Sequence, residues 1–160
     1  VSALMILLKN YLKKFSKNAN KENIKIKILG DVEILDNGLK KSVKDAVERT
    51  KMCTGLTLNI AFNYGGRDEI IRGIKKIVSS NVSEDEITEK FISENLDLPQ
   101  SPDVDLLIRT GGEMRVSNYL LWQIAYSEFI VKNEFWPDFD KELLSECILE
   151  FNNRNRRWGK

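Results

Sequence analysis

Short strand-like segments alternate with helical segments along this chain, and this alternation restricts the folds that it can adopt. The strand-like segments cover residues 24–29, 56–62, 104–108 and 129–131. Segment 104–108 is almost wholly apolar, which is typical of strands buried on both faces of a parallel sheet. The order of strands and helices therefore predicts an α/β domain with a mainly parallel sheet.

Between the strands, apolar residues recur at the spacing of amphipathic helices. The helical segments that we expect are 1–15, 39–47, 70–78, 118–126 and 140–155, with Ser117 as the N-cap of the fourth. In the third of these, we expect the apolar side chains to lie on the inside: Ile70, Ile71, Ile74, Ile77 and Val78. Ser83 and Glu86 have the spacing of a capping box, which can begin another short helix.

Length and charge narrow the class of protein. The 160 residues fit one compact domain, and the net charge of +1 argues against a general nucleic-acid binder. The charge is uneven, because residues 1–30 carry seven lysines and one glutamate, whereas residues 84–105 carry eight acids and one lysine. Two solvated faces explain this pattern. The alternative is that the basic end lies near an anionic membrane.

Cysteine and histidine usage excludes several kinds of site. Cys53 and Cys147 are far apart without metal-ligand spacing, and the chain has no histidine. His-based acid–base catalysis and most zinc sites are therefore excluded. We expect both cysteines to be reduced and buried, and the protein to be cytoplasmic. No apolar run approaches the length needed to span a bilayer.

Three loops follow predicted strands, at the edge of a parallel sheet where ligands bind. They are Gly30-Asp31, 63–67 and 109–117, and the second and third each contain a Gly-Gly pair and an arginine. Glycine lets backbone N–H groups approach an anion, and the arginine fork suits phosphate oxygens. The alternative is that a Gly-Gly pair only makes a turn and that an isolated arginine is a solvated charge.

The third loop has the composition of a phosphate site. Arg109, Arg115 and Ser117, just before a predicted helix, make a diphosphate cradle to which the helix N-terminus would add its free N–H groups. Glu113 and Glu128 lie nearby in the sequence, and a carboxylate beside a diphosphate suggests Mg²⁺. Taken alone, Glu128 is more typical of a surface acid.

An aromatic stripe follows the cradle. Tyr119, Trp122 and Tyr126 would share one side of the predicted helix. Such a stripe is more typical of packing or of a subunit interface than of a cofactor site.

The longest motif decides between these alternatives. RTGGEMRVSNYLLWQIAYSE at 109–128 resembles the signature of the cis-prenyltransferases, and LTLNIAFNYGGRDEI at 56–70 resembles the motif that precedes it. VSALM, KIKILGD, FWPDF and RNRRWG follow the order of the same family. The resemblance, to enzymes of the undecaprenyl diphosphate synthase kind, implies a central, mostly parallel sheet ringed by helices, and a homodimer.

The resemblance also implies roles for particular residues. By motif position, Arg109, Arg115 and Ser117 would hold the diphosphate of isopentenyl diphosphate, and Glu128 would help to place Mg²⁺. Arg157 and Gly159 match an RxG motif that reaches the active site of the partner subunit. The loop Gly65-Gly66-Arg67 also fits the family.

One family motif is absent. The catalytic aspartate of the family lies in an Asp-Gly-Asn-Gly-Arg-Trp motif near the N-terminus, and this chain lacks that motif. We therefore expect residues 1–160 to be the C-terminal portion of a catalytic domain, with no catalytic residue of its own and little activity alone.

The implied activity is the condensation of isopentenyl diphosphate onto an allylic diphosphate such as farnesyl diphosphate. The product would be a Z-polyprenyl diphosphate such as undecaprenyl diphosphate, a lipid carrier precursor for cell-wall synthesis, and its release implies peripheral membrane contact. The growing hydrocarbon needs an apolar tunnel. Segments 1–15 and 56–62 could form the wall of that tunnel, and packing in the core explains their apolar residues equally well. A non-catalytic partner subunit of a prenyltransferase complex is the alternative, and a generic anion-binding module is a third reading.

Overall fold

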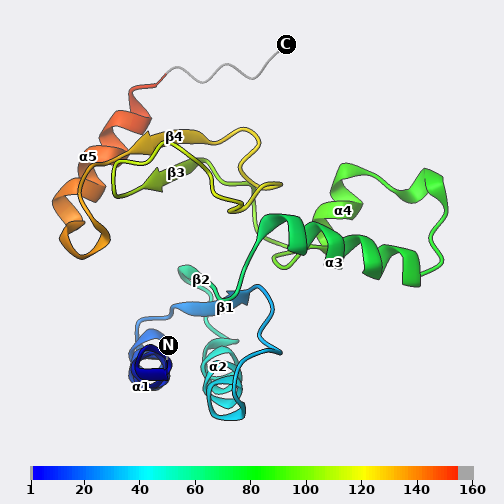
Figure 1. Ribbon diagram of the computed structural model, residues 1–160, viewed down its shortest axis with the longest axis horizontal. Coiled ribbons are helices and arrows are strands. Elements are labelled where there is room, and N and C mark those ends of the chain that lie inside the picture. The colour runs from blue at the N-terminus through cyan, green and yellow to red at the C-terminus, as the bar shows by residue number, and fades with distance from the viewer. Residues whose placement is uncertain (1, 155–160) are drawn as a thin grey trace. The chain divides into compact units, whose positions relative to one another are not determined.

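The structure is a computed structural model that describes the backbone of residues 2–154 and the side chains of residues 7 and 9–154. The chain divides into two compact units, Val1–Pro99 and Gln100–Lys160 (Figure 1). Each unit contains one pair of parallel strands, so the predicted α/β class is confirmed. That the whole chain forms one domain stays a prediction.

The first unit begins with a parallel strand pair covered by two helices. Its elements are α1 (Ser2–Lys21), β1 (Lys25–Leu29), α2 (Asn37–Thr50) and β2 (Thr57–Ala61). The two strands pair in register from Lys25↔Thr57 to Leu29↔Ala61, with α2 as the crossover between them. Helix α2 starts after Asp36, whose carboxylate accepts hydrogen bonds from the N–H groups of Gly38 and Leu39.

The core of this part lies between α1, α2 and the strands. Helices α1 and α2 lie side by side (Figure 1), and Leu12 of α1 is buried together with Leu39 and Val43 of α2. Ile28 and Ile60, one from each strand, pack against that cluster. This burial follows from the apolar stripe of each helix, because such stripes are stable only against other apolar surface.

The first unit continues with two further helices, α3 (Gly66–Ser79) and α4 (Glu89–Asn95), separated by the 3₁₀ turn Glu84–Glu86. The predicted capping box of Ser83 and Glu86 is confirmed, with the Ser83 N–H donating to Glu86 Oε2 at 3.0 Å. Helix α4, which the sequence did not reveal, is capped by Thr88.

The predicted inner face of α3 is wrong in part. Ile77 is buried, whereas Ile71 and Ile74 are each 50% exposed and Val78 is 73% exposed. The buried face instead contains Gly66, Glu69, Gly73 and Ile77. The physical reason is that Glu69 is hydrogen-bonded inside the unit and that Gly73 lets Leu96 approach the helix closely.

The second unit contains the remaining strands and one helix. Strands β3 (Leu106–Arg109) and β4 (Glu128–Val131) pair in parallel, from Leu106↔Glu128 to Arg109↔Val131. The 3₁₀ turn Trp136–Asp138 leads to α5 (Lys141–Asn152), which is capped by Asp140. Cys147 of α5 is fully buried, and it and Cys53 are both free thiols, as expected.

The helix predicted over 118–126 is wrong, because this segment forms a series of turns. Ser117, Asn118 and Leu120 have φ angles of 51°, 63° and 46°, which lie in the left-handed region and are incompatible with a right-handed helix. Across the part of the chain that the structure describes, no helix is both long and apolar enough to cross a membrane.

Candidate functional site

A pocket of about 320 Å³ opens at the carboxyl end of β3 in the second unit. It brings together the three residues of the predicted diphosphate cradle, Arg109, Arg115 and Ser117. The other lining residues are Leu107, Ile108, Thr110, Val116, Tyr119 and Phe129. The volume and the mixture of apolar wall with a few convergent polar groups are those of a small-molecule site.

Arg109 is the central cation of this pocket. It is the last residue of β3, and its Nη1 donates to Ser117 Oγ at 3.2 Å and to the carbonyl of Arg115. Its Nε is buried and has no hydrogen-bond partner among the described residues. Because buried donors are nearly always satisfied in folded proteins, an unsatisfied guanidinium N–H in a pocket favours an anionic ligand.

Arg115 lies on the more open side of the cradle. It forms an ion pair with Glu113 at 2.6 Å, and the two side chains are 61% and 50% exposed. An exposed pair of this kind contributes little to stability, so it leaves Arg115 able to rearrange toward a ligand. Burial raises the pKa of Tyr119, which lines the same pocket.

The Gly-Gly pair of this loop does not serve the pocket in the way that the sequence suggested. The N–H of Gly111 donates to the carbonyl of Glu134 at 2.8 Å, and that of Gly112 donates to the carbonyl of Lys132 at 2.9 Å. Their φ angles of 87° and 72° need glycine. The pair thus fixes the loop to the segment after β4, and these two N–H groups are already in use.

The helix N-terminus expected beside the cradle is also absent, because 118–126 forms turns. The positive charge of the pocket therefore comes from the two arginines and not from a helix dipole. Left-handed backbone at three non-glycine residues is strained, and such strain concentrates at functional sites.

Glu128 does not line this pocket. It begins β4, opposite Leu106, whereas Arg109 ends β3, so the register places the two residues at opposite ends of the strand pair. Arg154 Nη1 donates to Glu128 Oε2 at 2.8 Å and to the carbonyl of Phe129 at 3.2 Å, and Nη2 pairs with Glu150. These bonds to Glu128 and Glu150 raise the pKa of Arg154.

The described residues do not make a magnesium site by themselves. Among the side chains that the structure describes, no group of three Asp, Glu, Cys or His residues is arranged to hold a metal ion. Glu128 offers one carboxylate, and one of its oxygens accepts a hydrogen bond from Arg154. A complete octahedral site would need further ligands.

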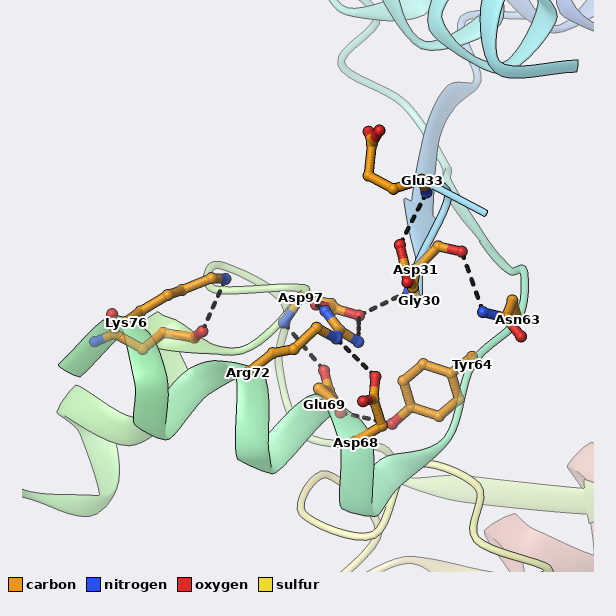
Figure 2. A network of polar contacts seen from close by, with 11 residues as sticks. Gly30, Asp31, Glu33, Asn63, Tyr64, Asp68, Glu69, Arg72, Lys76 and Asp97 are labelled. Atoms are coloured by element: carbon orange, nitrogen blue, oxygen red, sulfur yellow. Dashed lines mark hydrogen bonds and ion pairs between the residues drawn. The ribbon is translucent and has the colours of Figure 1, made fainter. Parts of the chain in front are cut away.

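The loops after β1 and β2 are joined by a network of charged side chains in the first unit (Figure 2). Asp97 Oδ2 accepts from the Gly30 N–H at 2.7 Å and from Arg72 Nη2 at 2.9 Å. Glu69, which is 1% exposed, accepts from the Tyr64 hydroxyl at 2.5 Å and from the Asp97 N–H at 3.0 Å. The Gly30 N–H is therefore used inside the protein.

Sequence reasoning missed Arg72, Asp97 and Arg154, because no spacing in the chain signals contacts between residues 25 or more apart. Burial raises the pKa of Asp97, but the hydrogen bonds from Arg72 and Gly30 outweigh this and hold it below its usual value.

The other predicted site residues are placed as follows. Gly65 precedes α3 as its N-cap, Gly66 begins the helix and is buried, and Arg67 is exposed. Arg157 and Gly159 lie outside the described residues.

Comparison with known proteins shows the family of this chain. The family model described as "Putative undecaprenyl diphosphate synthase" matches residues 1–159. The chain belongs to the undecaprenyl diphosphate synthase family.

Curated relatives support this assignment. The "Ditrans,polycis-undecaprenyl-diphosphate synthase ((2E,6E)-farnesyl-diphosphate specific)" of Micrococcus luteus is 45% identical over 163 residues, which cover 99% of this chain and 66% of that protein. An isoprenyl transferase of Rickettsia bellii is 46% identical over 160 residues, which cover 100% of this chain and 70% of that protein. The chain thus spans about two thirds of the length of the curated relatives it matches.

Solved structures agree with this family. A "probable undecaprenyl diphosphate synthase" from Campylobacter jejuni matches with a TM-score of 0.84 and 37% identity, covering 99% of this chain and 72% of that one. Lavandulyl diphosphate synthase from Lavandula x intermedia, in complex with dimethylallyl diphosphate, has a TM-score of 0.93 and 28% identity, covering 98% and 70%.

Proposed function

We propose that the complete protein is a cis-prenyltransferase that condenses isopentenyl diphosphate onto an allylic diphosphate, with farnesyl diphosphate as the primer. In this proposal, residues 1–160 are the C-terminal portion of its catalytic domain, and the product is a Z-polyprenyl diphosphate such as undecaprenyl diphosphate, for cell-wall synthesis. The Micrococcus luteus relative, which is named as farnesyl-diphosphate specific, supports the choice of primer.

The observation that carries the proposal is the pocket with two arginines and a serine. The guanidinium of Arg109 has a buried N–H that lacks a partner among the described residues, and Arg115 and Ser117 lie on the same pocket. Two planar guanidinium groups and a hydroxyl suit the oxygens of a diphosphate. We therefore assign this cradle to isopentenyl diphosphate.

The role of the cradle in the reaction follows from the chemistry. The allylic diphosphate ionises to an allylic cation and pyrophosphate, the isopentenyl double bond attacks the cation to form a carbon–carbon bond, and a proton is lost from the adjacent carbon. Arg109 and Arg115 hold the isopentenyl diphosphate so that its double bond faces the cation, which lowers the entropic part of the barrier. No covalent nucleophile or histidine is needed.

We include Mg²⁺ in the proposal for the complete protein, with Glu128 as one ligand. The metal would stabilise the departing pyrophosphate. The described residues do not complete its coordination. In this proposal, the catalytic aspartate and the remaining metal ligands would come from parts of the protein outside the described residues. Arg157 and Gly159, the proposed substrate-binding residues of the RxG motif, also lie outside them.

A homodimer and peripheral contact with a membrane belong to the same proposal. Tyr126, Phe135 and Trp136 are 74%, 69% and 74% exposed, and exposed aromatic side chains of this size are typical of subunit interfaces. Membrane contact would let the long hydrocarbon product leave a cytoplasmic enzyme.

The alternative function, a non-catalytic partner subunit, has less support. Such a subunit would have no need of an intact diphosphate cradle, yet Arg109, Arg115 and Ser117 are all present and share one pocket. No observation on the described residues favours this alternative.

The direct test is incorporation of label. The complete protein, given farnesyl diphosphate, Mg²⁺ and radiolabelled isopentenyl diphosphate, should transfer the label into a butanol-soluble lipid. EDTA should stop the reaction. Absence of labelled lipid would contradict the proposed activity, and incorporation that continues in EDTA would contradict the metal requirement alone.

A further inference from the structure

A basic groove of about 300 Å³ lies between α1 and α2. It belongs to the first unit, whereas the diphosphate cradle belongs to the second. Four cations line it, Lys9 and Lys13 from α1 and Lys41 and Arg49 from α2. Asp45 is the one carboxylate among the lining residues. Four positive charges against one negative charge leave the groove with a net charge of +3.

The charges of the groove are not neutralised within the protein. None of its four cations has a carboxylate within 4.0 Å among the described residues. Two lysines nearby behave differently, because Lys40 pairs with Glu33 at 3.0 Å and Lys51 pairs with Glu48. Solvated lysines on a helix surface are common, but four uncompensated cations around one concave site raise the local affinity for anions.

The sequence of the two helices builds this groove. The floor includes the hydroxyl of Ser16, a 2% exposed residue whose Oγ donates to the Lys13 carbonyl at 3.4 Å. Gly38 has no side chain, and a Cβ there would lie 2.7 Å from Lys9 Nζ, so this lysine can lie across the start of α2. A polar floor beneath cationic walls suits a phosphate group and does not suit an apolar ligand.

The basic surface extends beyond the groove along α1. This helix of 20 residues contains five lysines and no Asp or Glu, and the three outside the groove, Lys14, Lys17 and Lys21, are all exposed. Helix α1 is about 30 Å long, at about 1.5 Å per residue. Its lysines occupy residues 9–21, a length of about 18 Å. A row of charges over that length fits an extended anionic surface better than it fits one small phosphate.

We propose that the basic groove and the lysines of α1 dock the protein on an anionic membrane, with lipid headgroup phosphates seated between Lys9, Lys13, Lys41 and Arg49. Each lysine or arginine near an anionic bilayer adds attraction, which falls off within a Debye length. This inference rests on the proposed function, which includes contact with a membrane. It adds which surface makes that contact and that the lipid is anionic.

Vesicle co-sedimentation of the complete protein tests the docking surface. The probes are vesicles of phosphatidylcholine with and without about 30% phosphatidylglycerol, at about 0.1 M salt. The test variant is Lys9→Ala, Lys13→Ala and Lys41→Ala combined. The matched control removes three exposed lysines elsewhere, as Lys75→Ala, Lys90→Ala and Lys141→Ala, so that both variants lose the same net charge.

The wild-type protein should bind only the anionic vesicles. The groove variant should bind them at least about tenfold more weakly, and the control variant should bind almost as well as wild type. Both variants should keep the melting temperature of the wild type, because alanine is tolerated on exposed helix surfaces. Both should also keep the wild-type turnover of detergent-dispersed substrate.

Three results would overturn the inference. The first is no binding of the wild type to anionic vesicles, and the second is equal loss of binding in the groove and control variants. The third is displacement of the protein from vesicles by inorganic pyrophosphate at about 1 mM, a concentration too low for general charge screening. The last result would assign the groove to a free phosphate ligand. Because binding is measured without substrate, absence of prenyltransferase turnover in a protein that docks normally would contradict the proposed function and not the docking surface.

Discussion

Arg154 holds Glu128 through a hydrogen-bonded ion pair of 2.8 Å, and it also bonds the carbonyl of Phe129 in the same strand. The two side chains are 33% and 28% exposed, so water screens their attraction only in part. Because Arg154 directly follows the C-cap of α5, these bonds hold the end of α5 against the start of β4. Arg157 and Gly159 come shortly after Arg154 in the sequence.

Replacing Arg154 should destabilise the protein through this contact. Arg154→Met leaves Glu128 partly buried without its cation, at a cost of about 1.5 kcal/mol, the scale of a charged hydrogen bond. The melting temperature should fall by about 3–6 °C in a protein of this family's length. Glu150→Gln is the control, because it removes the other ion pair of Arg154 and leaves the bond to Glu128. Equal effects of the two variants would contradict a special role for Glu128.

Asp97 should make stability depend on pH in the acid range. Its pKa is lower in the folded state than in the unfolded state, so its ionised form stabilises the fold above the unfolded pKa of about 3.9. That contribution is lost as the pH falls through the folded pKa. Asp97→Asn should cost about 2 kcal/mol at neutral pH, and the difference from wild type should shrink on acidification.

Urea unfolding at several pH values checks this expectation. The control is Asp85→Asn, at an exposed residue of the same unit. A difference between Asp97→Asn and wild type that stays constant from neutral to acid pH would show that Asp97 does not act through its charge.

The 160-residue chain alone should be nearly inactive. It lacks the Asp-Gly-Asn-Gly-Arg-Trp motif of the family, and it spans about two thirds of the length of its curated relatives. Label incorporation by this chain should be compared with that by the complete protein under the same conditions. Comparable turnover would show that residues 1–160 contain all the groups that the reaction needs.

The complete protein should be a homodimer at micromolar concentration. Burial of Phe135 and Trp136 at an interface would remove apolar surface from water, at about 25 cal/mol per Å². Light scattering measures the mass, and Trp136→Lys should shift the equilibrium toward the monomer. A wild-type monomer at that concentration would contradict the proposal.

The sequence predicted the strands well, because each of the four is short, rich in isoleucine, leucine or valine, and bounded by turn residues. The sequence also predicted that Arg109, Arg115 and Ser117 share one site, since Arg109 ends a strand and the other two lie in the loop that follows it. The predictions that failed depend on the tertiary structure. Ser117, Asn118 and Leu120 have left-handed backbone. Their residue types also occur in helices, so the sequence does not indicate that the helix is interrupted there.

The buried face of α3 could not be predicted for a related reason. An apolar stripe normally faces inward, but Glu69 is buried because Tyr64 and the Asp97 backbone satisfy its oxygens. Asp97 is 28 residues away from Glu69, and nothing in the local sequence marks it as a partner. The place of Glu128, at the far end of the strand pair from Arg109, likewise follows only from the register.

Steady-state kinetics of Arg109→Ala in the complete protein, varying each substrate in turn, test the diphosphate cradle most directly. The variant should lose about 1.5–3 kcal/mol of binding to isopentenyl diphosphate, or roughly 10- to 150-fold in kcat/KM for that substrate. The KM for farnesyl diphosphate should change much less, and Arg109→Lys should recover only part of the loss, because an ammonium keeps the charge without the planar fork. Lys141→Ala, an exposed cation of the same unit, should behave as wild type. Equal damage to the use of both substrates, together with a lowered melting temperature, would mean that Arg109 only braces the loop and would contradict the cradle.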